Sequence, residues 1–430
     1  MVILTLPTGW YMLGAASAVV LTAIITALAP RLPQFGQARL FEWPAAPSRT
    51  LTSTVSCLVL LALIAIGFLG NRDPLSNLLT VTIWTLFWVG LPILAAIFGD
   101  VFRPIEPWTG PARLARGALG RTGSVGLARF GYVPAVAGLF AFAWFEIVSL
   151  SPADSLVLAR VVLAYWLLHF LIAVLEGESW LRHGETFSVF FGLIARIAPL
   201  WTETRGNRAT LMAAPPGAWL LSGPPMGAGL IAFVTLVLAA VTFDGVSETF
   251  RWLALIGINP LEFPGRSAVT GVNTLGLVAT WALMAGSILA AIWAGWRASG
   301  ARGTFRETAG RLIPTFLPIA AGFHAAHYLV SLLTGGQYAL AALNDPFGTG
   351  ARLLGLPHHW VSFGFLADRH QVLMIWNAQF ALVLGAHVLA LILSIRAAPD
   401  WPWRAHLPMT ALMVALTTLG LWLLASPTGA

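Results

Sequence analysis

Long uninterrupted apolar runs constrain this chain more than any other feature. A transmembrane helix needs about 20 predominantly apolar residues, and ten segments of the sequence meet or approach that length. We expect these spans at residues 10–28, 52–69, 79–99, 130–150, 156–175, 226–243, 268–295, 312–333, 371–395 and 408–425. The sequence therefore predicts an all-α, polytopic transmembrane helical bundle, with residues 1–430 forming a single integral-membrane domain in the lipid bilayer.

The charged residues fit that prediction and exclude two other classes of protein. Only 10% of the residues are charged and 58% are hydrophobic, whereas about 25% of a soluble domain is charged. The net charge is +7, but the arginines lie in short loops between apolar runs, so we exclude a nucleic-acid-binding protein. The single cysteine, Cys57, lies within an apolar run, which excludes a disulfide framework and a cysteine-ligated metal cluster.

The distribution of arginine predicts the orientation of the bundle. No basic residue precedes the first apolar run, whereas Arg31, Arg39 and Arg49 follow it. A secretory signal needs a basic segment at its start, so we interpret this run as a first transmembrane helix with its N-terminus outside. Eighteen arginines then fall in inner loops and five in outer segments. Because inner loops carry an excess of basic residues, we expect both termini outside.

One segment, residues 176–202, does not fit a simple span. Its start is rich in glutamate and its apolar second half contains Arg196. We expect a re-entrant or interfacial helix on the inner side. On a helix Glu178, Arg182 and Glu185 would share one face, which is typical of a solvated salt-bridge face.

A second segment, residues 334–370, is predicted to be a long outer loop. Loops of this length are uncommon unless they have a function or are disordered. The loop contains a set of potential metal ligands, namely Asp345, His358, His359, Asp368 and His370.

Four histidines lie within the predicted spans. The segment 312–333 has no charged residue, yet it contains His324 and His327, which are three apart and share one helix face. His169 and His387 lie near the middle of two other spans. Neutral imidazole is a common ligand of transition metals, so these four residues are candidate ligands of a divalent transition metal. Two alternatives stay open: hydrogen bonds to carbonyl and hydroxyl groups of neighbouring helices, and a proton relay.

The carboxylates Glu146, Asp244 and Glu248 lie within a predicted span or near the end of one. Glu146 is the one that lies well inside a span. We expect Glu146 to be neutral or paired with a cation such as Arg160, and it is a candidate for either an ion pair or a functional acid. Asp244 and Glu248 are four apart at a helix end, where capping and a tight turn are the usual roles of such residues.

Seven motifs follow one another in order between about residues 80 and 395. They are FGDVFRPIEPW (98–108), LFAFAWFEIV (139–148), EGESWLRHGETFSVFFGLIARIAPL (176–200), TFDGVSE (242–248), AAHYLVSLL (325–333), LNDPFGTG (343–350) and WNAQFALVLGAHVLAL (376–391). Together these motifs resemble a bacterial polytopic membrane family called fenitrothion hydrolase.

The resemblance implies a multi-pass protein of the bacterial inner (plasma) membrane that hydrolyses organophosphate triesters, which are apolar small molecules. It also implies a partner membrane subunit. The matching motifs FAWFE, AHY and GAHV place the candidate catalytic residues at Glu146, His327 and His387. A membrane transporter and a membrane subunit of a metal-handling or electron-transfer complex are the alternative functions.

Overall fold

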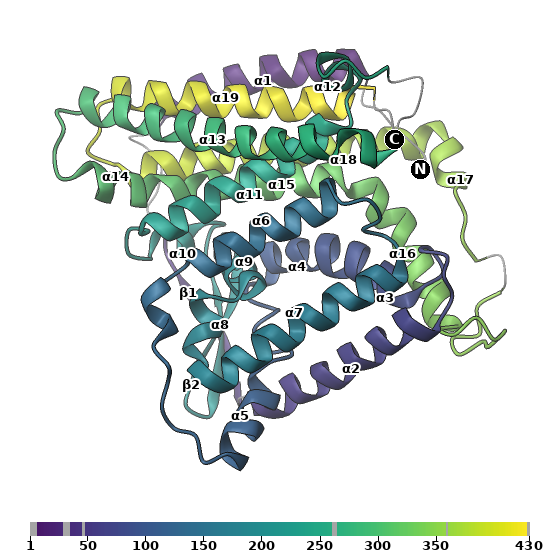
Figure 1. The fold of residues 1–430 in the computed structure, drawn as a ribbon. Coiled ribbons are helices and arrows are strands. Elements are labelled where there is room, and N and C mark those ends of the chain that lie inside the picture. Colours follow the sequence, from purple (N-terminus) through teal and green to yellow (C-terminus); the bar gives the residue numbers. More distant parts are fainter. Residues whose placement is uncertain (1–6, 29–34, 45–47, 260–264, 358–359, 428–430) are drawn as a thin grey trace.

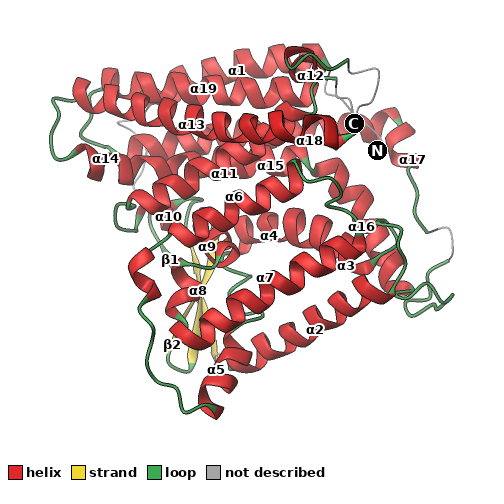
Figure 2. Ribbon diagram, viewed as in Figure 1, coloured by secondary structure: helices red, strands yellow, loops and turns green. Residues whose placement is uncertain are grey.

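The computed structural model describes residues 7–28, 35–44, 48–259, 265–357 and 360–427. These residues are mainly helical (Figure 1, Figure 2), which confirms the predicted helical bundle. Within this part of the chain, eight helices are long and apolar enough to cross a membrane, so the chain has the architecture of a helical membrane protein. They are α1 (Thr8–Leu28), α2 (Arg49–Leu69), the rod formed by α3, η2 and α4 (Leu78–Phe98), α7 (Ser155–Glu176), α11 (Ala228–Ser247), α13 (Arg266–Ala298), α18 (Arg369–Ala397) and α19 (Trp403–Ala425).

A bent pair of helices is a further candidate span. Helix α14 (Phe305–Leu312), η6 (Ile313–Phe316) and α15 (Leu317–His327) run together, and α16 (Leu329–Asn344) continues at an angle of 58°. The predicted span 312–333 is therefore broken at Tyr328. If the pair crosses the membrane as one unit, the number of candidate spans rises to nine.

The prediction of a loop over residues 334–370 was wrong for its first residues, because α16 continues to Asn344. The glycines in this stretch do not end the helix. A Cβ atom at Gly335 would lie 2.4 Å from Thr85 Oγ1, so Gly335 allows α16 to approach η2 closely. The connection from Asp345 to α18 contains the short helix α17 (Gly364–Ala367), and His358 and His359 lie outside the described residues.

Several shorter helices fill the space between the long ones. Helix α6 (Val133–Ile147) has 15 residues, fewer than the 17 to 25 or so of a typical span. The segment 176–202 forms α8 (Ser179–His183) and α9 (Thr186–Ile194), which are also too short to span a bilayer. The remaining short helices are α5 (Thr109–Ala118), η3 (Leu127–Phe130), η4 (Ala195–Ile197), α10 (Ala218–Leu221) and α12 (Phe250–Leu255).

A small antiparallel sheet was not predicted. Its strands are β1 (Ala38–Pro44), β2 (Leu200–Arg205) and β3 (Arg208–Ala213), in the order β1-β3-β2. The hairpin between β2 and β3 has a two-residue turn, and Gly206 adopts φ +58° at its first position. Glycine at that position is typical of a tight hairpin turn that matches the twist of the strands. The last residues of segment 176–202 thus belong to a strand.

The long helices form two groups joined by shorter ones. In Figure 1, α1, α13, α18 and α19 lie together at the top of the view, and α2, α3, α5 and α7 lie at the bottom. Helices α6, α9, α11 and α15 lie between the two groups, where the main apolar core is found. This central layer contains most of the polar residues described below.

Helices α15 and α18 pack closely at Gly322. A Cβ atom at this position would lie 2.3 Å from the Cβ of Ala386 and 2.8 Å from the carbonyl oxygen of Leu382. Small residues at helix contacts let backbones approach closely within membranes. Gly322 therefore fixes the separation of these two helices.

We predict that Gly322→Val destabilises the protein by about 1–3 kcal/mol, because the backbone of α18 must move to admit the side chain. Thermal unfolding of the purified protein measures the effect. The matched control is Gly286→Val in α13, where an added Cβ meets no atom within 4 Å. Equal stability of the two variants would contradict close packing at Gly322.

Candidate functional site

The polar side chains at the break between α15 and α16 form a hydrogen-bonded cluster. The Tyr328 hydroxyl oxygen lies 2.6 Å from Asp244 Oδ2 and 3.1 Å from Glu146 Oε1. Because a tyrosine hydroxyl carries one proton, two linear hydrogen bonds at this oxygen require a second proton from one of the carboxyl groups. Tyr328, Asp244, Glu146 and the neighbouring His327 are called the acid–base cluster below.

His327 completes the cluster through Asp244. The distance from His327 Nε2 to Asp244 Oδ2 is 3.1 Å. A hydrogen bond from Nε2–H to the carboxylate leaves Nδ1 as the basic nitrogen of the neutral ring. The side chains of His327 and Asp244 are 19% and 14% exposed, so both are mostly buried but not sealed from water.

The ends of four helices position these groups. Glu146 lies in the last turn of α6, Asp244 in the last turn of α11, and His327 is the last residue of α15. Arg266, the first residue of α13, donates from Nη1 to the carbonyl oxygens of Glu146 (2.8 Å) and Ser149 (3.0 Å). Cationic groups stabilise the free carbonyls at a helix C-terminus, so Arg266 holds the end of α6 in place.

Glu248 adds a further carboxyl group just after α11. Burial raises the pKa of Glu248 to about 7, and the charge of Asp244 adds to the rise, whereas His327 and Arg266 oppose it. The cluster thus borders a carboxyl group that can exchange protons near neutral pH.

His324 lies one turn before Tyr328 and has a backbone partner. Its Nε2 lies 3.0 Å from the carbonyl oxygen of Trp88. Trp88 belongs to the π-helix η2 (Thr82–Gly90), and Pro92 lacks the N–H that would reach this carbonyl in an α-helix. His324 therefore satisfies a backbone acceptor that the proline leaves available.

His387 and His169 lie in other hydrogen-bonded environments. The two ring nitrogens of His387 lie 2.8 Å from Thr22 Oγ1 and 2.9 Å from Thr417 Oγ1, which join α1, α18 and α19. Trp180 Nε1 donates to His169 Nδ1 at 3.0 Å. These contacts, together with that of His324, agree with the alternative in which buried histidines bond to carbonyl, hydroxyl and other groups of neighbouring elements.

The structure does not assemble the predicted metal site of His169, His324, His327 and His387. Among the described residues, no three histidine, cysteine, aspartate or glutamate side chains converge closely enough to hold a metal ion. The physical reason is that His387 and His324 are engaged by protein groups, and His169 lies beside Trp180. Of the candidate catalytic residues, Glu146 and His327 share the acid–base cluster, whereas His387 bonds elsewhere.

Two further predictions about carboxylates need correction. Glu146 does not pair with Arg160, because its side chain contacts the Tyr328 hydroxyl and Arg160 is exposed. Asp244 is not limited to helix capping, because its side chain binds His327 and Tyr328. The role of Asp244 was missed because the residue lies at a helix end, where capping is the usual role. The sequence feature that could have indicated the cluster is Tyr328, which directly follows His327.

Of the predicted solvated face, Glu185 is the residue that departs from the prediction. Glu185 is fully buried and accepts hydrogen bonds from Tyr165 and from the backbone N–H groups at the start of α9. Glu178 is 33% exposed and forms an ion pair with Arg113 at 2.6 Å, and Arg182 is exposed. The segment packs inside the protein because its phenylalanines are apolar and buried.

Two carboxylates of the candidate outer-loop site, Asp345 and Asp368, serve local structure. Asp345 accepts from the backbone N–H groups of Thr349 and Gly350, and Asp368 caps α18. These contacts stabilise turns and a helix end.

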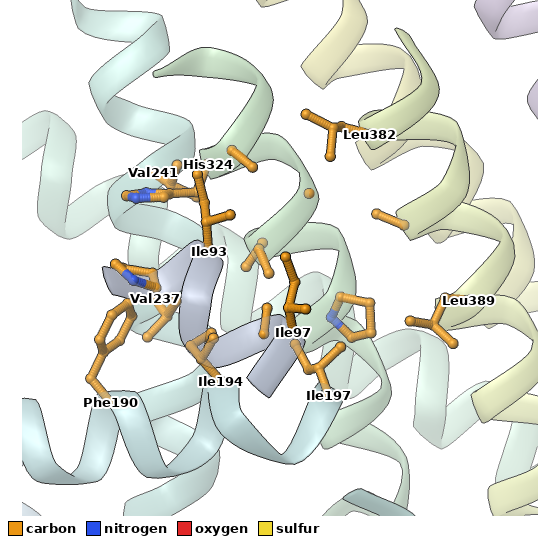
Figure 3. Close-up of a pocket in the computed structure, with 18 of the residues that line it drawn as sticks. Ile93, Ile97, Phe190, Ile194, Ile197, Val237, Val241, His324, Leu382 and Leu389 are labelled. Carbon is orange, nitrogen blue, oxygen red and sulfur yellow. The ribbon is translucent and has the colours of Figure 1, made fainter. Parts of the chain in front are cut away.

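An apolar cavity of about 300 Å³ lies near the acid–base cluster. It lies between α4, α9, α11, α15 and α18, and Figure 3 shows Ile97 of α4 and Leu389 of α18 on opposite sides. His324 lines this cavity, and its ring centroid is 4.8 Å from that of Tyr328. The cavity is therefore one helical turn away from the cluster.

Comparisons with protein-family models, with curated proteins and with solved structures find no match to this chain.

Proposed function

We propose that the protein is a hydrolase of the bacterial inner membrane that cleaves lipophilic phosphotriesters with water activated at the acid–base cluster. The observation that carries the proposal is the pairing of His327 with Asp244 at 3.1 Å, with Tyr328 linking Asp244 to Glu146. A histidine held by a carboxylate is a common arrangement of a general base. The resemblance to fenitrothion hydrolase supports the same choice, because its AHY and FAWFE motifs contain His327 and Glu146.

The proposed reaction follows from the proton positions. His327 Nδ1 takes a proton from water while the water oxygen forms a bond to phosphorus. The bond from phosphorus to the aryl oxygen breaks, and the aryl oxide leaves with the bonding electron pair. Asp244 stabilises the imidazolium that forms, and Tyr328 with Glu146 stabilises Asp244 in its position.

We predict that His327→Gln lowers the hydrolysis of fenitrothion by about 10²–10⁴-fold, because general base catalysis contributes that factor. Release of the nitrophenol from purified protein in lipid nanodiscs measures the rate. The control is His406→Gln, since His406 is also buried in a helix but contacts Trp401 outside the cluster.

A third variant, His387→Gln, tests whether the remaining candidate catalytic residue, His387, takes part in the reaction. We expect it to unfold at a lower temperature while keeping its activity, because its two threonine contacts join helices. Activity that survives in His327→Gln would contradict the proposal, and loss of activity in stable His387→Gln would add His387 to the site.

Proton or cation transport is the second candidate function. The row of proton-exchanging groups from His327 through Asp244 and Tyr328 to Glu146 favours it, since such chains form relays in membrane transporters. A pH gradient that collapses in vesicles containing the wild type, and persists with Asp244→Asn, would favour transport over hydrolysis.

We further propose that the bent pair and the short helix α6 also cross the membrane, which gives ten crossings with the eight long helices. Both termini then face outward, and the acid–base cluster lies toward the outer side. The excess of arginine in the loops assigned to the inside supports this orientation. Reporter fusions after residues 120 and 305 are expected to lie in the cytoplasm, and a fusion after residue 350 is expected outside. Reversed signals would place the cluster on the cytoplasmic side.

A further inference from the structure

The apolar cavity beside the acid–base cluster has the features of a ligand chamber. Its volume of about 300 Å³ is about twice that of an engineered apolar cavity, of about 150 Å³, that stays dry and binds benzene. Among the residues that the structure describes, no charged side chain lines it, and His324 is the titratable residue in its wall. A charged ligand would lose its hydration there without gaining a partner.

The rim of the cavity faces the apolar surface of the bundle. Ile97 of α4 is 42% exposed and Leu382 of α18 is 37% exposed, and both line the cavity. Figure 3 shows the two helices on either side of it. A lipophilic molecule dissolved in the bilayer can therefore reach the cavity between α4 and α18 without crossing water.

A buried donor, Trp88 Nε1–H, lies near both the cavity and the cluster. Trp88 lines the cavity and is 7% exposed. Its Nε1–H makes no hydrogen bond of good geometry to the described residues, although it interacts with Glu146 and Tyr328. A ligand acceptor atom that met this donor in good geometry would therefore gain a hydrogen bond on the side toward the cluster.

We propose that this cavity binds the neutral, lipophilic substrate of the hydrolase, with Trp88 Nε1–H donating to the oxygen or sulfur atom on phosphorus. The proposal rests on the proposed hydrolase function for the identity of the substrate. The cavity holds the apolar part of the molecule, and the adjoining cluster supplies the activated water. The anionic diester product is excluded by the apolar wall, so it leaves after each turnover.

Gly385 offers a way to fill the cavity without disturbing the packing. It lines the cavity, and an added Cβ meets no atom within 4 Å. In Gly385→Phe the ring occupies the chamber or its mouth. Gly286→Phe is the matched control, because Gly286 lies in the long helix α13 and its Cβ position is also open.

Equilibrium binding of radiolabelled fenitrothion to each protein in nanodiscs, with empty nanodiscs as background, tests the proposal. We expect saturable binding to the wild type, to Gly286→Phe and to His327→Gln, and binding weaker by about tenfold or more in Gly385→Phe. Trp88→Phe is expected to bind about fivefold more weakly, and the anionic diester should not compete.

The outcomes separate the cavity from the reaction. Unchanged binding in Gly385→Phe, or no saturable binding to the wild type, would overturn the cavity proposal. If hydrolysis depends on His327 but the KM of Gly385→Phe equals that of the wild type, the hydrolase function is supported and the cavity is not the substrate site. If Gly385→Phe weakens binding but the wild type does not hydrolyse fenitrothion, the hydrolase function is contradicted. The cavity would then still be a binding site for neutral lipophilic molecules.

Discussion

The hydroxyl of Tyr328 joins two carboxyl groups that would otherwise repel each other inside an apolar bundle. Asp244 and Glu146 come from α11 and α6, and each contacts this one oxygen atom. Burying two carboxylates without a shared donor would cost several kcal/mol. The break between α15 and α16 is what places Tyr328 there, so the bent pair of helices and the cluster depend on each other.

The break between α15 and α16 also places the cluster close to the cavity. His324 and Tyr328 are one turn apart on either side of the end of α15. His324 faces the apolar chamber and Tyr328 faces the carboxyl groups. In the proposed hydrolase, a substrate in the chamber would thus lie near groups that exchange protons.

The apolar runs were sufficient to predict the helical bundle, because their length is set by the thickness of the bilayer. They were not sufficient for the break at Tyr328, because no proline lies at that point and the run is apolar on both sides. The sheet was missed in part because β1 is distant in the sequence from β2 and β3, and it pairs with β3 through tertiary contacts. For the site, Glu146 and His327 could be selected as polar residues in apolar runs, whereas the pairing of Asp244 with both His327 and Tyr328 depends on how α11 packs against α15.

Tyr328 and Glu146 are expected to act as one hydrogen-bonded unit. A double-mutant cycle with Tyr328→Phe and Glu146→Leu, measured as the free energy of unfolding in nanodiscs, tests this coupling. We expect a coupling energy of about 0.5–3 kcal/mol, because the two side chains share a contact. Additive effects of the two substitutions would show that the hydroxyl of Tyr328 does not bond to Glu146.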